Sequence, residues 1–302
     1  MELRGAYTAL ITPFKEDGKI DYDGLVRNIH HQMENRITGI VPLGTTGETP
    51  TLSRAEQDEI IRISVREAKG RMQIIVGCGS NSTEHTVENV HIARDMGADA
   101  ALIVTPYYNK PTDEGVYRHF CEISTRCDIP VVVYNIQGRT GKNITPDLMQ
   151  RIATLGNVIG VKEASGDLDQ MARMIDVSRT HDNFNVVSGD DAYALDLIAI
   201  GGTGVISVVS NLLPAEVSDL VAHALDGDYC KAKEMHEYLL PIFKGAFIET
   251  NPIPIKEAMN YCGMPAGGYR LPLCEMMPEN RDRLHAIIDS MDIRRRIIPK
   301  RI

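Results

Sequence analysis

The residue whose type and position could do the most specific chemistry is Lys162. It follows residues 158–161, a run too short and too rich in strand-forming residues to be anything but a buried strand. Burial disfavours the charged ammonium and lowers the pKa of a lysine. A neutral lysine amine is a nucleophile that forms a Schiff base with a carbonyl substrate. The alternative is a lysine whose side chain reaches back to solvent at the strand end.

Other polar and reactive side chains follow further predicted strands. The candidates are Thr45 and Thr46 after the second strand, Tyr107 and Tyr108 after the fourth, Tyr134 at the end of the fifth with Arg139 in its loop, Ser188, Asp190 and Asp191 at the seventh and Ser207 in the eighth. If these strands are parallel neighbours, the groups gather on one face and Tyr134 lies beside Lys162. Gly160 shares the face of Lys162, and we expect its small size to leave room for the lysine side chain.

The elements that must position these groups are short strands alternating with amphipathic helices. Helical spacing is seen, for example, in Leu25, Ile29 and Met33, and helix starts are marked by a capping box at 53–56 and by Thr145 before proline. The predicted strands are 6–11, 39–43, 73–77, 100–104, 130–134, 158–162, 185–188 and 204–208. This alternation predicts an α/β fold, a (β/α)8 TIM barrel, whose active site lies at the C-terminal ends of the strands.

We expect two parts: the barrel over residues 1–227 and a C-terminal helical extension over 228–302, where no strand pattern occurs. A doubly wound sheet would need a dinucleotide-binding glycine motif after the first strand, where residues 12–14 read Thr-Pro-Phe. The basic cluster of Arg294–Arg296 with Lys300 and Arg301 is expected to be a frayed, solvated tail.

Composition narrows the class of protein. The net charge of -9 argues against nucleic-acid binding, and no apolar run approaches the roughly 20 residues that cross a membrane. The N-terminus has no signal-peptide pattern, and the six cysteines are scattered without a CxxC pair, which indicates reduced thiols in a cytoplasmic protein. The nine histidines show no metal-binding spacing, so we expect no metal.

Several residues at the same face have simpler roles available. The Gly-Thr-Thr-Gly run at 44–47 alone is typical of a capped turn, and it is not a phosphate-binding loop. The glycine-rich run at 201–204 precedes a strand and indicates a tight turn. We expect Glu48 to be a structural hydrogen-bonding residue, and Asp190 and Asp191 to be helix caps.

Taken together, the motifs resemble the dihydrodipicolinate synthase/N-acetylneuraminate lyase family over nearly the whole chain. The matching runs, in order, are 44–48 (GTTGE), 107–109 (YYN), 134–135 with 139–141 (YN, RTG), 160–164 (GVKEA), 188–191 (SGDD), 204–207 (GVIS), 251–256 (NPIPIK) and 270–273 (RLPL). The family consists of pyruvate-dependent class I aldolases on a (β/α)8 barrel with a C-terminal helical extension.

The resemblance implies a mechanism that needs no cofactor, because the substrate is held covalently on Lys162. Pyruvate forms a Schiff base there, loses a methyl proton and attacks an aldehyde as the enamine. Tyr134 is then the general acid/base, and Thr46 with Tyr108 relays protons to solvent. Thr45 and Thr46 hold the pyruvate carboxylate, and backbone carbonyls near Gly189 and Ile206 line the pocket.

The same resemblance implies an assembly, a homotetramer built from tight dimers in which Tyr107 or Tyr108 enters the neighbouring subunit's site. Arg139 in an Arg-Thr-Gly run is similar to the synthase branch, where it binds L-aspartate 4-semialdehyde. The implied product is 4-hydroxy-tetrahydrodipicolinate, in lysine and diaminopimelate biosynthesis.

Two departures from the family pattern matter. Residues 136–138 lack the usual proline, so we expect a freer loop around Arg139 and keep open a lyase or dehydratase acting on a 2-keto-3-deoxy sugar acid or N-acetylneuraminate. Arg54, Gln57 and His85 stand at the family's lysine feedback site without the acidic partner of inhibited enzymes, which predicts weak or absent inhibition. A third alternative, a keto-acid sensor without turnover, predicts broken catalytic positions, whereas Lys162 and Tyr134 are present.

Overall fold

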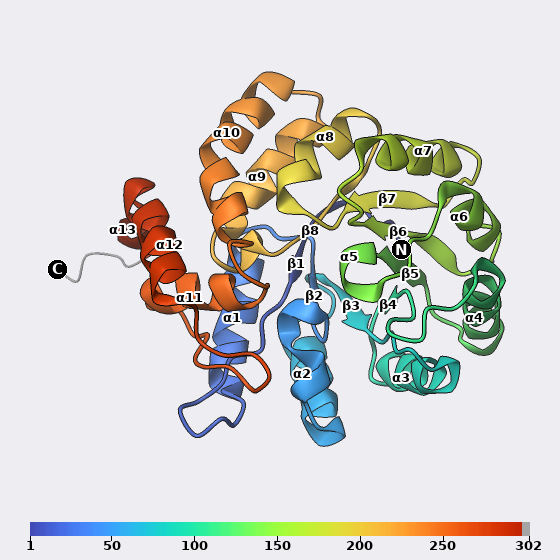
Figure 1. Cartoon of the computed structure of the whole chain (residues 1–302), viewed down its shortest axis with the longest axis horizontal. Helices are drawn as coiled ribbons and strands as arrows, with labels where there is room; N and C mark the ends of the chain where they lie inside the picture. Colours follow the sequence, from blue (N-terminus) through green and yellow to red (C-terminus); the bar gives the residue numbers. More distant parts are fainter. Residues whose placement is uncertain (298–302) are drawn as a thin grey trace.

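A computed structural model of the chain describes residues 1–297, and eight parallel strands form its centre. Hydrogen bonding joins the strands in chain order and closes the barrel between β8 and β1. Figure 1 shows the strands at the centre with the helices around them. The predicted (β/α)8 barrel is therefore confirmed. The strands are β1 (Gly5–Ala9), β2 (Gly39–Val41), β3 (Gln73–Gly77), β4 (Ala100–Val104), β5 (Val131–Asn135), β6 (Val158–Glu163), β7 (Asn185–Ser188) and β8 (Gly204–Ser207).

Three strands, β3, β4 and β7, have the predicted bounds, and the others differ by one or two residues. β2 ends at Val41 rather than residue 43 because Pro42 has no N–H to donate to the ladder. β1 ends at Ala9 because the N–H of Ile11 donates to the side chain of Asn211 instead of a strand. Local hydrogen-bonding partners therefore set the strand ends.

Helices cover the outside of the barrel, and their starts follow the sequence signals. The capping box at Ser53 and Glu56 is present, and the Thr145 hydroxyl accepts from the N–H of Leu148. The barrel helices are α1 (Tyr22–Glu34), α2 (Arg54–Ala68), α3 (Thr83–Asp95), α4 (Asp113–Arg126), α6 (Pro146–Ile152), α7 (Leu168–Arg179), α8 (Ala194–Ala199) and α9 (Pro214–Leu225), with the short turns α5 (Gln137–Thr140), η1 (Thr45–Gly47), η2 (Thr49–Thr51), η3 (Asp191–Tyr193) and η4 (Val209–Asn211).

Two apolar clusters form the core. The larger lies between the strands and the helices, and the smaller contains residues from seven of the eight strands and includes Tyr7, Tyr134 and Ile206. Because side chains alternate along each strand, the second cluster is the filling of the barrel interior. It supports the side chains at the barrel mouth from below.

Helices alone follow α9 in the described part of the chain: α10 (Tyr229–Gly245), α11 (Ile253–Tyr261), α12 (Pro278–Ser290) and α13 (Ile293–Ile297). α10 packs on α9, and α12 packs on α10 and α11. The division of the chain at residues 227 and 228 stays a prediction. None of the helices within residues 1–297 is long and apolar enough to cross a membrane.

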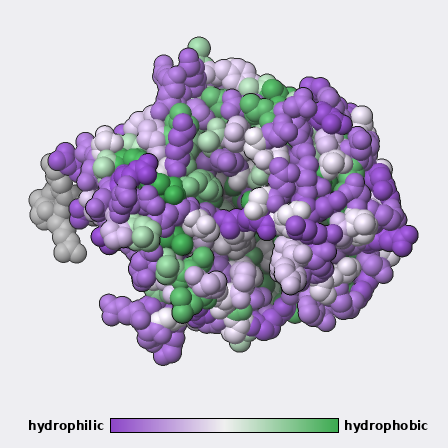
Figure 2. Space-filling view, in the orientation of Figure 1, coloured by the Kyte–Doolittle hydropathy of each residue, from purple (hydrophilic) through white to green (hydrophobic). Residues whose placement is uncertain are grey.

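The predicted fraying is wrong for Arg294–Arg296, which lie in α13, whereas their predicted exposure to solvent is confirmed. Ile293 is buried there, and the Arg294 guanidinium stacks over the Tyr261 ring at 4.9 Å from its centroid. Lys300 and Arg301 lie outside the described residues. Figure 2 shows a largely hydrophilic face with apolar side chains left of centre, where Figure 1 places α1, α10 and α11.

Candidate active site

Lys162 and Tyr134 form the centre of the site. They are paired residues of the neighbouring strands β6 and β5, and both side chains are buried. The Lys162 Nζ lies 4.3 Å from the centroid of the Tyr134 ring. The predicted neighbourhood of these two residues is confirmed, whereas the alternative in which Lys162 reaches solvent is wrong, since its side chain is only 5% exposed.

Burial makes Lys162 a stronger nucleophile at neutral pH. Desolvation lowers the pKa of its ammonium to about 8, because the charged form loses the solvation of water. The carboxylates of Asp191 and Asp190 act in the opposite direction, and the Arg139 guanidinium adds to the lowering. A substantial fraction of the amine is therefore neutral near pH 8.

If Lys162 forms the Schiff base that the resemblance implies, the rate at which borohydride traps pyruvate on it is expected to depend on this pKa. Below about pH 8 the ammonium form dominates and cannot attack, so the rate should rise about tenfold per pH unit and level off above pH 8. Stopped trapping reactions between pH 6 and 10 measure the profile. A rate that continues to rise through pH 10 would mean that the lysine keeps its ordinary pKa.

Space for the Lys162 side chain comes from Gly189, and the prediction that Gly160 supplies it is wrong. A Cβ atom at Gly189 would lie 3.0 Å from Lys162 Cε and 2.7 Å from Ala164 Cβ. At Gly160 a Cβ would meet the Asn185 carbonyl oxygen at 2.3 Å, so that glycine permits the close approach of β7. Any side chain at position 189 would therefore displace the lysine.

Two acidic residues follow β7 and play different parts. Asp190 caps η3, as predicted, by accepting from the N–H of Ala192 at 2.9 Å. Asp191 is not a cap of its own helix, which corrects the prediction. Its carboxylate accepts from the N–H groups of Val208 and Val209 and from the Ser207 hydroxyl, so it joins the ends of β7 and β8. Burial raises the pKa of Asp191 to about 6.

Tyr134 has the environment of a proton donor rather than of a phenolate. Burial raises the pKa of its phenol well above the ordinary value, and the nearby Arg139 charge opposes this rise. Its ring packs in the same interior cluster as Ile206, which is fully buried. The ring is therefore fixed on the side of the barrel interior, next to Lys162.

The turn η1 carries the two threonines. Thr46 is buried and Thr45 is half-buried. The Thr46 hydroxyl accepts a hydrogen bond from the side-chain amide of Asn251 at 3.0 Å. Glu48, directly after the turn, is fully buried and forms an ion pair of 2.6 Å with Lys256 of α11. The expected structural role of Glu48 is confirmed, and its partner is a residue of the C-terminal helices.

Arg139 lies on α5, the helical turn after β5. The segment that we expected to be a freer loop is thus a helical turn, in which the Thr140 hydroxyl donates to the Ile136 carbonyl. The Arg139 guanidinium is exposed and donates through Nη2 to the backbone carbonyl of Asn251 at 3.0 Å. This contact joins the Arg139 guanidinium to the segment just before α11.

Tyr107 and Tyr108 are both exposed in the single chain. Tyr108 is 88% exposed and adopts a left-handed backbone conformation with φ of 72°. That conformation is unfavourable for residues other than glycine, and most of all for a bulky residue such as tyrosine. The structure therefore does not bring Tyr108 into the site of its own chain.

Sequence reasoning missed Asn251 and Lys256 as contacts of the site. Both belong to the motif at 251–256 that contributed to the resemblance, yet their partners Thr46 and Glu48 lie more than 200 positions away in the chain. The signal that could have found them was the pairing of a polar residue and a lysine in an otherwise apolar motif, because a buried lysine needs an acidic partner.

The residues that the resemblance places at a feedback site make local contacts. Arg54 forms an ion pair with Asp58 at 3.0 Å and donates to Asn89, and Gln57 donates to the Leu52 carbonyl. Weak or absent inhibition by lysine stays a prediction.

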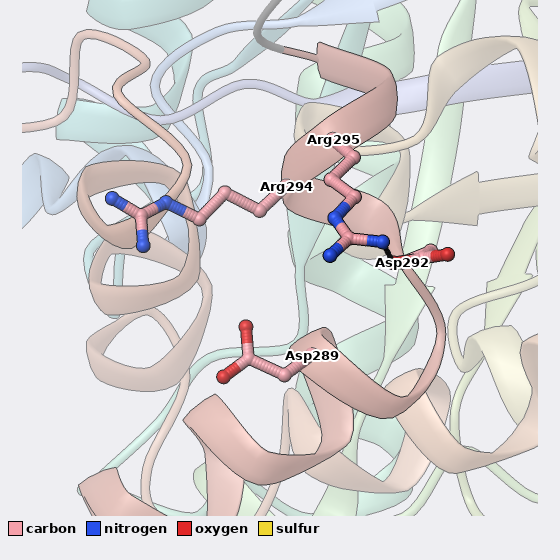
Figure 3. Close-up of a pocket in the computed structure, with 4 residues that line it drawn as sticks. All are labelled: Asp289, Asp292, Arg294 and Arg295. Atoms are coloured by element: carbon pink, nitrogen blue, oxygen red, sulfur yellow. Dashed lines mark ion pairs between the residues drawn. The ribbon is translucent and has the colours of Figure 1, made fainter.

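A cavity of about 420 Å³ lies apart from the barrel mouth, at α12 and α13. Figure 3 shows its lining of Asp289, Asp292, Arg294 and Arg295, with the Arg295–Asp292 ion pair dashed. The two acidic and two basic side chains balance in charge, so the cavity has no net charge that would attract a charged substrate. Within residues 1–297 no group of three or more His, Cys, Asp or Glu side chains is arranged to hold a metal ion.

Known proteins similar to this chain match nearly its whole length. A model of the dihydrodipicolinate synthetase family matches residues 2–291. A 4-hydroxy-tetrahydrodipicolinate synthase from Protochlamydia amoebophila is 50% identical over 96% of this chain and 97% of its own length. The crystal structure of dihydrodipicolinate synthase from Thermotoga maritima superposes with a TM-score of 0.95 at 41% identity, covering 97% of this chain and 100% of that one. A structure described as the first monomeric dihydrodipicolinate synthase variant matches with a TM-score of 0.94 at 41% identity, covering 96% and 97%.

Proposed function

The chain belongs to the dihydrodipicolinate synthetase family, and from that premise we propose that it is a 4-hydroxy-tetrahydrodipicolinate synthase. It is a lyase that condenses pyruvate with L-aspartate 4-semialdehyde in lysine and diaminopimelate biosynthesis. The observation that carries the proposal is the buried Lys162 beside the Tyr134 ring, on a chain that matches curated synthases over nearly its full length.

The reaction begins with the neutral Lys162 amine attacking the ketone carbon of pyruvate. Loss of water gives the iminium, which draws electrons from the methyl group so that a proton leaves and an enamine forms. Tyr134, whose phenol stays protonated, supplies and recovers the protons of these steps. No cofactor is needed, because the lysine nitrogen itself is the electron sink.

The enamine carbon then attacks the aldehyde of the second substrate. The amino group of that substrate attacks the imine carbon, closes the ring and frees Lys162. The two threonines of η1 hold the pyruvate carboxylate, with the hydroxyl of Thr46 also passing protons, and carbonyls near Gly189 and Ile206 line the pocket. The buried position of Thr46 next to β2 supports this assignment.

We propose that the tyrosine of this relay comes from a second copy of the chain. Tyr108 is too exposed in the single chain to serve its own site, and its left-handed backbone conformation is strained. A tight dimer in which the partner chain covers Tyr108 accounts for its unfavourable backbone conformation. Two such dimers then form the homotetramer. All six cysteines are unpaired, which supports placing the enzyme in the reducing cytoplasm.

Arg139 selects the second substrate. A planar guanidinium forms two parallel hydrogen bonds to a carboxylate, and its contact with the Asn251 carbonyl uses only one of its nitrogens. The carboxylate of L-aspartate 4-semialdehyde is the matching group.

The substitution Arg139→Leu is expected to lower kcat/KM for L-aspartate 4-semialdehyde by about 10²-fold, because a charged hydrogen-bonding pair is lost. The pyruvate concentration that half-saturates borohydride trapping should change less than about threefold. Steady-state kinetics with Arg151→Leu as the control makes the comparison, since Arg151 is paired with Glu114 on the surface. Equal losses of affinity for pyruvate and of kcat/KM for L-aspartate 4-semialdehyde would contradict the assignment of Arg139 to the second substrate.

A second candidate activity, cleavage of a 2-keto-3-deoxy sugar acid or N-acetylneuraminate, is favoured by one observation. Gln137 at the start of α5 is exposed where the family usually carries a proline, and its amide could hydrogen-bond sugar hydroxyls. Turnover with each of the three substrates, measured side by side, tests the proposed function. Faster turnover of a sugar acid than of L-aspartate 4-semialdehyde would overturn it.

A further inference from the structure

Asn251, just before α11, connects the C-terminal helices to two side chains at the barrel mouth. The residue is buried, its amide nitrogen donates to the Thr46 hydroxyl, and its backbone carbonyl accepts from Arg139, each at 3.0 Å. Thr46 and Arg139 are the side chains to which the proposed function assigns the carboxylates of the two substrates. Asn251 thus contacts both the side chain assigned to the carboxylate of the first substrate and the side chain assigned to the carboxylate of the second.

A buried ion pair holds this arrangement in place. Lys256 lies five residues after Asn251, and Glu48 lies two residues after Thr46. The Lys256 Nζ is 2.6 Å from Glu48 Oε1 and also donates to the Thr12 carbonyl at 3.2 Å. The segment carrying Asn251 and the turn carrying Thr46 are therefore fixed to one another by two neighbouring contacts.

The direction of the hydrogen bond to Thr46 decides where its own proton points. The hydroxyl accepts from the amide, so its proton remains free for another acceptor. Asn251 Oδ1 is buried without a hydrogen-bond partner among residues 1–297. Turning the amide over would pair this oxygen with the Thr46 proton, and that proton would then be lost to the substrate. A carboxylate only accepts hydrogen bonds, so it is the group suited to the free proton.

We propose that Asn251 is a positioning residue that orients the Thr46 hydroxyl to donate to the carboxylate of the bound 2-oxo acid. It acts through Thr46 and does not touch the substrate. The inference rests on the proposed function, because it takes pyruvate as the acid held on Lys162. The Arg139 contact uses the backbone carbonyl, so a change of the Asn251 side chain leaves that contact in place.

The test is Asn251→Asp, in which an acceptor replaces the donor at nearly the same size. A carboxylate there draws the Thr46 proton toward itself and away from the substrate. The pyruvate concentration for half-maximal borohydride trapping should rise about 10- to 100-fold, whereas KM for the aldehyde changes less than about twofold. An aspartic acid buried at this position has a raised pKa. The ratio to the wild-type half-saturating concentration should therefore shrink as pH falls from 8.5 to 6, because the protonated carboxyl can again donate to Thr46. A purely structural role gives no such pH dependence.

Two further variants keep the test decisive. Asn280→Asp adds the same charge to α12, where the side chain contacts Glu249, and should keep wild-type affinity for pyruvate. Asn251→Ala should weaken pyruvate binding a few-fold in the wild-type background and not at all in Thr46→Val, because the effect passes through that hydroxyl. The alanine variant also replaces the aspartate variant if circular dichroism shows that the latter is unfolded.

The inference is overturned if Asn251→Asp binds pyruvate like the wild type, or if Asn251→Ala and Thr46→Val are additive. Failure of the proposed function is a separate result: it would show as a wild-type enzyme that traps no pyruvate or does not turn over the aldehyde. Since trapping needs no second substrate, an error in the aldehyde alone leaves the test of Asn251 intact.

Discussion

Replacing Lys162 by alanine is expected to lower kcat for the condensation by at least about 10⁴-fold. No other described lysine at the barrel mouth is both buried beside Tyr134 and lowered in pKa, so nothing else can form the iminium that stabilises the carbanion. The product formed from pyruvate and L-aspartate 4-semialdehyde is measured with purified wild-type and variant enzyme at pH 8.

The control for this variant is Lys142→Ala. Lys142 lies after α5, where its amine pairs with Asp113 on the surface. Loss of this ion pair should keep kcat within about twofold of the wild-type value, because surface ion pairs contribute little to the stability of the fold. Substantial turnover by folded Lys162→Ala would mean that the reaction does not pass through this amine.

The second large effect concerns stability. Replacing Lys256 by methionine is expected to lower the free energy of unfolding by about 3–5 kcal/mol, because it leaves the Glu48 carboxylate buried without its partner. Burial also lowers the pKa of Lys256, and the Glu48 carboxylate opposes this shift by favouring the charged lysine. Denaturant unfolding followed by circular dichroism measures the loss.

The double variant Glu48→Gln with Lys256→Met should recover most of this loss, since neither buried charge then remains. Lys233→Met is the surface control, because its contact with Glu237 is long and exposed, and it should change stability by less than about 0.5 kcal/mol. A loss below about 1 kcal/mol in the Lys256 single variant would contradict the account of the buried pair.

The barrel could be predicted from the sequence because its signals are local. Each strand is a short apolar run, each helix has its own period and cap, and the order of parallel strands then makes Tyr134 and Lys162 neighbours. The reactive lysine was predicted from its place at the end of a buried strand, and the roles of Tyr134, Thr46 and Arg139 from the resemblance to a known family. The helical turn α5 was missed because four residues are too few to show a period.

Contacts between distant segments could not be predicted in the same way. Asn251 meets Thr46 from 205 positions away, and no pattern near either residue indicates the other. The role of Gly189 depends on where the Lys162 side chain lies, and that of Asp191 on the N–H groups after β8. Such contacts follow from packing in three dimensions rather than from periodicity.

The most direct test of the account is borohydride reduction of the enzyme in the presence of pyruvate, followed by peptide mass spectrometry. The account predicts one reduced pyruvate adduct, located on Lys162 and absent when pyruvate is left out. An unmodified Lys162 after reduction, or an adduct on another lysine, would contradict it.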